Sequence, residues 1–232
     1  MTWLDPDEIQ AVMLSLKVAG TATVVSLPLA VMVALVLARG RFFGRAALDA
    51  VIHLPLVLPP VATGFALLIL FGHKGVLGEM LERVGVVFAF RWTGAALAAG
   101  IMAFPLMVRP IRLAIEAIDR EVDEAARTLG ASAVMRLFSI TLPLAAPGLA
   151  GGAVLGFAKA LGEFGATITF VAAIPGETLT LPTAIYQATQ SPGGEARALL
   201  LCGVAAVIAL GAVVASDRFS GSLVKQRAGE SS

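Results

Sequence analysis

The sequence predicts an all-α fold, a polytopic membrane helix bundle with five spans, its N-terminus outside and its C-terminus inside the cell. The first observation is composition: the 232 residues are 58% hydrophobic and 14% charged, with a mean hydropathy of +0.89. A soluble domain of this size cannot bury so much apolar surface, so the bilayer is the expected solvent. The second is that five stretches approach the roughly 20 apolar residues that cross a bilayer. The third is the uneven placement of Lys and Arg between them.

The first predicted span covers residues 11–38. It follows a segment that has no basic residue and that carries Asp5, Asp7 and Glu8. A secretory signal peptide begins with a basic region, so we expect this helix to stay in the mature protein. The second and third predicted spans, residues 51–71 and 93–115, are each long enough to cross the hydrocarbon layer.

The fourth predicted span, residues 142–161, is rich in prolines and small residues: Pro143, Pro147, Gly148, Gly151, Gly152 and Gly156. Small residues let helix backbones approach closely in lipid, so we expect this helix at the centre of the bundle. The fifth, residues 199–215, is near the lower length limit. It contains Cys202, the only cysteine, so no intrachain disulfide can form, and we interpret Cys202 as a small buried residue.

Basic residues set the predicted orientation, because cytoplasmic loops retain Lys and Arg. Three groups mark the inner side: Arg39, Arg41 and Arg45; Arg109, Arg112, Arg120, Arg127 and Arg136; and Arg218, Lys225 and Arg227. An outside N-terminus and an inside C-terminus require an odd number of crossings, which five spans satisfy. A sixth span drawn from residues 162–198 is the main alternative.

Residues 162–198 interrupt the span pattern. The apolar run 164–174 is too short to cross a bilayer, and prolines and glycines then break regular structure repeatedly. Irregular backbone at membrane depth is tolerated only where protein buries it or where it lines a wet cavity. We interpret residues 162–198 as an outward-facing, partly re-entrant gate region, with an ordinary surface loop as the alternative.

Residues 119–143 form a polar, charge-rich segment between the third and fourth spans, and the pattern predicts a helix-turn-helix. Asp119 can cap a first helix, and acidic residues suit its first turns. Gly130 can end that helix in the left-handed conformation, and Ser132 can cap a second one. The first helix has one apolar face, formed by Ile118, Val122, Ala125, Ala126 and Leu129. An amphipathic helix lying on the membrane surface is the alternative.

The order Glu124-Ala125-Ala126, then Gly130, then Ile140-Thr141-Leu142-Pro143 resembles the EAA loop of permease subunits in ATP-binding-cassette (ABC) importers. In that family the loop is the coupling helix that docks into a cytoplasmic ATPase. The resemblance implies coupling roles for Glu124, Ala125, Ala126, Gly130, Leu142 and Pro143. It also implies the type I ABC importer permease fold, with residues 1–232 forming a single transmembrane permease domain.

Two further stretches are similar to the oxyanion importers of this family, and most to the molybdate permeases. They are residues 53–60 (HLPLVLPP) and residues 160–178, which contain ALGEFGAT and IPGET. The likeness implies a homodimer of permeases surrounded by lipid in the plasma (inner) membrane of a prokaryote. It also implies two cytoplasmic ABC ATPase subunits and an external oxyanion-binding protein. A sulfate/thiosulfate or tungstate permease is the alternative within this class.

Charged residues inside spans are functional candidates, because burying them is costly. Lys159 and Glu163 are four residues apart, which places them on one helix face near the outer end of the fourth span. We interpret Lys159, Glu163, Phe164 and Thr167 as part of the translocation path or its gate. For Lys159 and Glu163, a plain ion pair without anion contact is the alternative.

The sequence contains no Gly-x-x-x-x-Gly-Lys-Ser/Thr phosphate loop, so ATP hydrolysis would fall to a partner subunit. It has no cysteine, histidine and carboxylate cluster with metal-ligand spacing, so we expect no metal and no cofactor, and nothing predicts a nucleic-acid partner.

An ion-coupled secondary transporter would show internal repeats and midplane carboxylates. An intramembrane enzyme would need a nucleophile and a base within the spans. Neither pattern is present, so we expect a permease subunit without enzymatic activity of its own.

Overall fold

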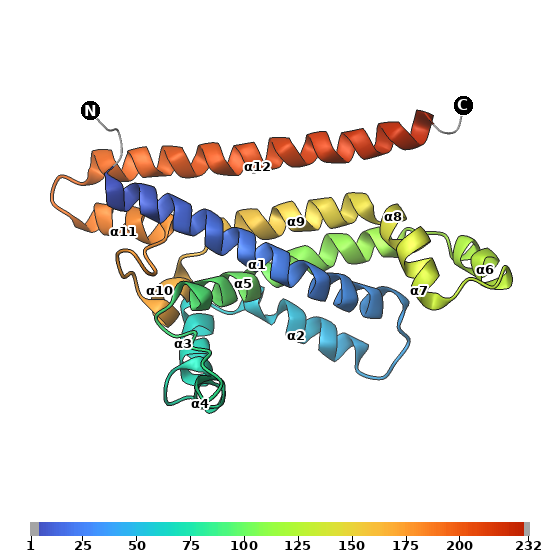
Figure 1. The fold of residues 1–232 in the computed structure, drawn as a ribbon, viewed down its shortest axis with the longest axis horizontal. Coiled ribbons are helices and arrows are strands. Elements are labelled where there is room, and N and C mark those ends of the chain that lie inside the picture. The colour runs from blue at the N-terminus through green and yellow to red at the C-terminus, as the bar shows by residue number, and fades with distance from the viewer. Residues whose placement is uncertain (1–4, 230–232) are drawn as a thin grey trace.

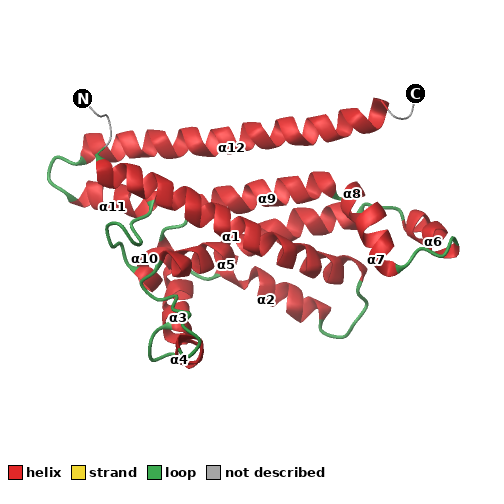
Figure 2. Cartoon of the chain, in the orientation of Figure 1, coloured by secondary structure: helices red, strands yellow, loops and turns green. Residues whose placement is uncertain are grey.

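The structure, a computed structural model, describes residues 5–229, with the side chains of residues 213 and 215–229 excepted. Every regular element among these residues is helical (Figure 2), in agreement with the predicted all-α class. The helices are α1 (Pro6–Arg39), α2 (Arg45–Val57), α3 (Pro60–Phe71), α4 (Val76–Glu82), α5 (Trp92–Glu116), α6 (Arg120–Thr128), α7 (Ala133–Arg136), a π-helical turn (Leu137–Thr141), α8 (Leu142–Leu144), α9 (Ala146–Leu161), α10 (Gly165–Val171), α11 (Leu181–Gln190) and α12 (Glu195–Gly229).

Helix α5 lies at the centre of the bundle, packed against both α1 and α9 (Figure 1). The buried faces of α1 and α5 are made largely of alanine, which allows their backbones to approach closely. In α9 the glycines at 148, 152 and 156 serve the same purpose. A Cβ atom at Gly148 would lie 2.3 Å from Cβ of Ala114, and one at Gly156 would lie 2.6 Å from the side chain of Met107. The predicted close packing is confirmed for these three glycines, whereas Gly151 faces open space.

The second predicted span is not a single helix. Helices α2 and α3 meet at an angle of 110°, and the residues between them, Leu58 and Pro59, have extended backbone angles. Proline restricts the residue before it to extended conformations, so the Pro59-Pro60 pair breaks the helix at this point. The prediction of one continuous helix over residues 51–71 is therefore wrong. As a result, α3 and α4 turn away from the axis of the bundle (Figure 1).

The fourth predicted span is also broken. The helical run Ala133–Leu144 meets α9 at 70°, and the break falls at Ala145, which is fully buried and has ψ near 0°. Pro147 then lies in the first turn of α9, where its missing amide hydrogen costs little. The prediction of one spanning helix over residues 142–161 holds as a continuous helix only from Ala146 onward.

The number of spans depends on how these bent pairs are counted. Helices α1, α5 and the Glu195–Ala212 part of α12 are each long and apolar enough to cross a membrane, and the count rises to five if each bent pair is one span. Five spans with the N-terminus outside remains a prediction. Cys202 on α12 is exposed, so its interpretation as a buried residue is wrong.

The region between α9 and α12 packs against the bundle. Helix α10 lies on α3 and α5, and α11 lies on α12 and α1. Three threonines in the connecting segment and in α11 are buried: Thr178, Thr180 and Thr183. The Ser15 hydroxyl of α1 also accepts a hydrogen bond of 2.6 Å from the backbone N–H of Leu181. These buried polar contacts show that the segment packs against the bundle, and its role as a re-entrant gate stays a prediction.

Candidate coupling loop and translocation path

Helix α6 has the end caps that the sequence predicts. The side chain of Asp119 accepts a 3.0 Å hydrogen bond from the backbone N–H of Glu121. At the other end, Gly130 has a φ of +84°, and the N–H of Ala131 donates to the carbonyl of Ala126 over 3.0 Å. A residue with a side chain strains in this left-handed conformation, whereas glycine does not.

The second half of the helix-turn-helix begins at Ser132, whose hydroxyl accepts a 3.2 Å hydrogen bond from the N–H of Met135. Arg136 of α7 then joins both halves. Its Nε donates to Oδ1 of Asp123 in α6 over 3.0 Å, and its Nη1 donates to the carbonyl of Ala131 in the turn over 2.8 Å. The two helices and the turn therefore form one connected unit.

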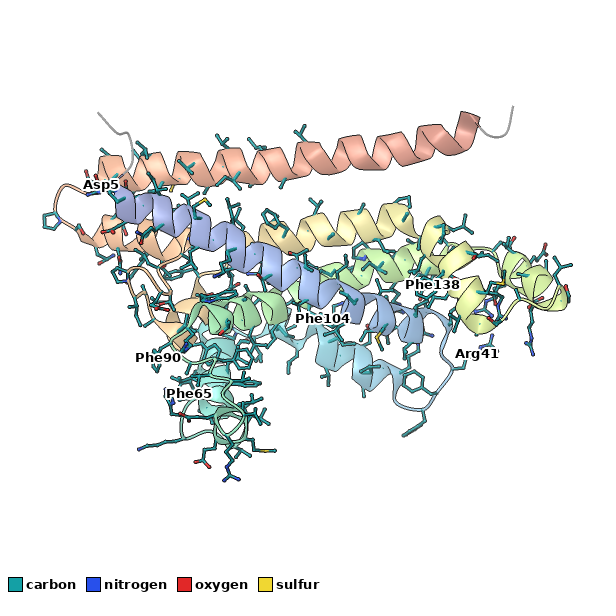
Figure 3. All side chains as sticks on the ribbon, in the orientation of Figure 1. Asp5, Arg41, Phe65, Phe90, Phe104 and Phe138 are labelled. Atoms are coloured by element: carbon teal, nitrogen blue, oxygen red, sulfur yellow. The ribbon has the colours of Figure 1, made fainter. Side chains whose placement is uncertain are left out.

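This unit stands at one end of the elongated bundle (Figure 1) and exposes apolar side chains. Leu129 is 88% exposed, and Val122, Val134, Met135 and Phe138 are also exposed (Figure 3 labels Phe138). Among the predicted coupling residues, Glu124, Ala125, Gly130 and Pro143 are exposed, and Ala126 and Leu142 are half-buried. Beside them lies a polar groove of about 460 Å³, lined by Arg39, Arg120, Glu124 and Arg136 among others. An exposed apolar surface with a charged groove at its base is suited to bind another protein.

The residues predicted for the translocation path meet at the junction of α9 and α10. Lys159 forms an ion pair with Glu163, as the plain ion-pair alternative proposed. Helix α9 ends at Leu161, so Glu163 lies beyond the helix and not on a shared helical face. The Glu163 residue is only 3% exposed, and its Oε1 accepts a 3.0 Å hydrogen bond from the N–H of Ala166. The pair thus fastens the end of α9 to the first turn of α10.

Phe164 and Thr167 occupy different surroundings. The rings of Phe164 and Tyr186 of α11 have centroids 5.1 Å apart, so Phe164 connects the α9–α10 junction to α11. Thr167 is buried inside α10 and lines neither the polar groove beside α6 nor the apolar groove between α1, α2 and α5. In the part of the chain whose side chains are described, no group of three or more His, Cys, Asp or Glu residues could hold a metal ion.

Residues 26–217 match the family described as binding-protein-dependent transport system inner membrane component. The chain belongs to this family. The matched range contains both the helix-turn-helix and the α9–α10 junction, so both features lie within the part that defines the family. The transport component is therefore an inner membrane protein.

Individual relatives are similar to this transport component over its whole length. It is 51% identical to the molybdenum transport system permease protein ModB of Escherichia coli K12 over 230 residues, covering 99% of this chain and 100% of the relative. It is 50% identical to ModB of Haemophilus influenzae over 220 residues, covering 94% of this chain and 96% of the relative.

Solved structures show the same fold at lower identity. A bacterial ABC transporter that imports the acidic polysaccharide alginate matches with a TM-score of 0.75 and 21% identity, over 95% of this chain and 81% of that one. The MetNI methionine ABC transporter matches with a TM-score of 0.65 and 16% identity, over 93% of this chain and 94% of that one. The transport component therefore has the fold of ABC importer permeases.

A charged network between α2 and α5 was missed by the sequence analysis. Arg112 of α5 donates to Oδ1 of Asp49 in α2 over 3.1 Å and to Oε1 of Glu116 over 2.9 Å. Arg45 reaches the same Glu116 oxygen over 3.4 Å. His53 lies in the same cluster, with Nδ1 2.9 Å from the carbonyl oxygen of Asp49. The position of Arg112 in a spanning helix, four residues before Glu116, was the available signal, but its other partner, Asp49, is 63 residues away in sequence.

We predict that the Arg136–Asp123 pair keeps the helix-turn-helix rigid. Arg136→Leu should lower the uptake rate roughly five-fold, which corresponds to the loss of an ion pair worth about 1 kcal/mol. Asp123→Asn/Arg136→Leu should be no worse than Arg136→Leu alone, because both changes remove the same interaction. Uptake by right-side-out vesicles supplied with loaded binding protein measures the effect, with Arg41→Leu as the control from another exposed arginine. Strictly additive losses in the double variant would contradict this role.

Proposed function

We propose that the chain is the transmembrane permease subunit of an ABC importer that carries molybdate across the plasma membrane. The observation that carries this proposal is the 51% identity to the ModB permease of E. coli over essentially the full length of both chains. The exposed helix-turn-helix, residues 119–143, supports it independently. A permease without an ATP site needs a surface that binds the ATPase whose hydrolysis of ATP drives transport.

The assembly that we propose has two copies of this chain, two cytoplasmic ABC ATPase subunits and an external oxyanion-binding protein. The alginate transporter, which shares the fold, has been described in complex with a pentasaccharide-bound periplasmic protein. In our proposal ATP closes the ATPase dimer, the two helix-turn-helix units approach each other, and the bundle opens outward. Glu124, Ala125, Ala126, Gly130, Leu142 and Pro143 would form the contact with the ATPase. Five spans with the N-terminus outside would place this contact in the cytoplasm.

In this assembly we place the anion path beside the α9–α10 junction. The Lys159 ammonium lies just before the gate region, residues 162–198, and it forms an ion pair with Glu163. A passing oxyanion could take the place of the Glu163 carboxylate, because both present oxygen acceptors to an ammonium group. Phe164 and Thr167 would then shape the wall of the path rather than bind the anion.

A sulfate permease is the second candidate, and one specific observation favours it. The chain is 33% identical over 183 residues to a probable sulfate transport system permease protein, cysT, of Chlorokybus atmophyticus. Sulfate and molybdate are both tetrahedral dianions, so a path that admits one is chemically suited to the other. The higher identity to ModB places molybdate first.

The test is ATPase activity in liposomes that hold this chain with its ATPase. Binding protein loaded with molybdate, tungstate or sulfate is titrated into the outside solution. Stimulation by the molybdate-loaded form supports the proposal, and stimulation only by the sulfate-loaded form replaces it with the second candidate. Transport that survives on an ion gradient without any ATPase would reject the importer assignment altogether.

We predict that Glu163→Gln weakens both the fold and uptake. The change leaves the Lys159 ammonium, which is partly buried, without its partner, at a cost of about 2 kcal/mol in unfolding free energy. Glu163→Gln/Lys159→Met should regain much of that stability, because it removes the unpaired charge as well. Thermal unfolding of the purified complex measures the difference. Equal loss in the single and double variants would show that the pair does not stabilise the junction.

A further inference from the structure

The helices α1, α2 and α5 enclose an apolar groove of about 520 Å³. Its walls include Val25 and Leu29 of α1, Val51 of α2, and Leu97 and Phe104 of α5 (Figure 3 labels Phe104). Val25 and Val51 are more than half exposed, so the groove is open along its length to the outside of the bundle. Its volume lies within the range of about 300–1,000 Å³ that is typical of small-molecule sites. In a membrane protein such a groove faces either lipid or another protein chain.

One end of the groove is lined by Trp92, the first residue of α5. The ammonium of Lys17 lies 3.7 Å from the centroid of the Trp92 ring, a cation–π contact. Tryptophan and lysine together are typical of the boundary between hydrocarbon and headgroups. The pair therefore indicates headgroup level for this end of the groove, with the rest extending toward the membrane interior.

A second, smaller cavity of about 300 Å³ adjoins this end. It shares Phe88, Trp92 and Thr93 with the apolar groove and adds Arg91. Among the residues whose side chains the structure describes, no carboxylate lies within ion-pair distance of Lys17 or of Arg91. Arg91 and Lys17 are therefore two exposed cations without an acidic partner at the mouth of an apolar groove.

We propose that this groove is a binding site for one anionic phospholipid. The phosphate would lie between Lys17 and Arg91, and an acyl chain would lie along the apolar walls toward Phe104. A single phospholipid supplies both the negative charge and the apolar chain that the two ends require. A helix of a second copy fits less well, because it would have to bury both cations or supply carboxylates at the same depth.

The site would also hold α2 in place. Pro55 of α2 lines the groove just before the 110° bend between α2 and α3. An acyl chain between α1, α2 and α5 fills space that these helices leave open, and so it adds van der Waals contacts on both sides of the groove. This inference concerns lipid binding and does not depend on which anion the protein transports.

The test is native mass spectrometry of the purified complex in detergent, titrated with phosphatidylglycerol and, separately, phosphatidylcholine. We expect one phosphatidylglycerol to be retained per permease chain and phosphatidylcholine to bind more weakly. Lys17→Ala and Arg91→Ala should each weaken phosphatidylglycerol binding roughly five-fold, the effect of one cation near an anionic headgroup. Lys74→Ala and Arg83→Ala, which remove exposed cations of the same loop outside the groove, serve as controls and should bind normally.

A second variant tests the apolar part of the site. Val25→Trp places a large side chain in the groove from an exposed position, so it should reduce binding without disturbing the α1–α5 contact. Elution of the variant as an intact complex on size exclusion controls for folding. The proposal is overturned if the Lys17 and Arg91 variants bind phosphatidylglycerol as well as the controls do. It is also overturned if Val25→Cys forms a disulfide between two copies in the membrane, because a second copy would then cover the groove.

Discussion

Gly130→Val should leave the protein in the membrane at its normal level and reduce uptake by roughly tenfold or more. No atom lies within 4 Å of the position that a Cβ atom would take, so the effect does not arise from a clash. It arises from the φ of +84°, because the left-handed conformation costs a side-chain-bearing residue about 1–2 kcal/mol and a β-branched residue more. The turn should therefore relax into another conformation and separate α6 from α7.

The size of the effect should follow conformational strain. Gly130→Asn should retain most of the uptake, since asparagine tolerates the left-handed conformation, and Gly130→Ala should be intermediate. Gly203→Val is the matched control: Gly203 lies in α12, also with nothing within 4 Å of a Cβ atom, but without a positive φ. Membrane insertion by immunoblot, uptake, and ATPase stimulation by loaded binding protein are measured together. Normal uptake by Gly130→Val would remove the coupling role from this turn.

Gly64→Ala should destabilise the complex by a few kcal/mol, because α3 and α10 touch through their backbones at this point. A Cβ atom on Gly64 would lie 2.4 Å from the carbonyl oxygen of Ala166 and 2.8 Å from its Cα atom. Backbone atoms cannot move aside as a flexible side chain can, so α10 would have to shift as a whole. The hydrogen bond from Ala166 to Glu163 would shift with it, and uptake should fall as well.

The comparison for this prediction is Gly20→Ala in α1, where no atom lies within 4 Å of the added carbon. Alanine is the better helix former, so this variant should be neutral or more stable by about 0.5–1 kcal/mol. Thermal unfolding of the two variants is monitored by size exclusion after heating. The difference between their midpoint temperatures tests the prediction. Equal midpoints for Gly64→Ala and Gly20→Ala would mean that α3 and α10 separate without cost.

The parts of the fold that depend on local chemistry could be predicted from the sequence. The spans predicted over residues 11–38 and 93–115 correspond to α1 and α5, whose ends differ from the prediction by a few residues. The caps at Asp119 and Ser132 and the left-handed Gly130 were predicted correctly. In each case the hydrogen bonds that cap or end the helix join residues only a few positions apart in the sequence.

The features that were not predicted depend on contacts between distant segments, or on a local signal that lies within a continuous apolar run. The Pro59-Pro60 pair could have marked the end of α2, but the apolar run continues through it and predicts a single span. Asp49, the partner of Arg112 in α2, and Trp92, the partner of Lys17, lie about 60 and 75 residues away from them, and no sequence pattern links these pairs. The anion path stays a prediction for a different reason: Lys159, Glu163, Phe164 and Thr167 are close in sequence, but neither the ion pair of Lys159 with Glu163 nor the burial of Thr167 identifies an anion contact.

The buried corner at Ala145 has a geometric consequence for how motion reaches the membrane. The run Ala133–Leu144 is about 18 Å long at 1.5 Å per residue, and it meets α9 at 70°. A sideways displacement of about 3 Å at its free end corresponds to a rotation of roughly 10° about Ala145 over that length. The start of α9 packs closely on α5 at Gly148, so we expect such a rotation of the arm to act on α9 next to its contact with the central helix.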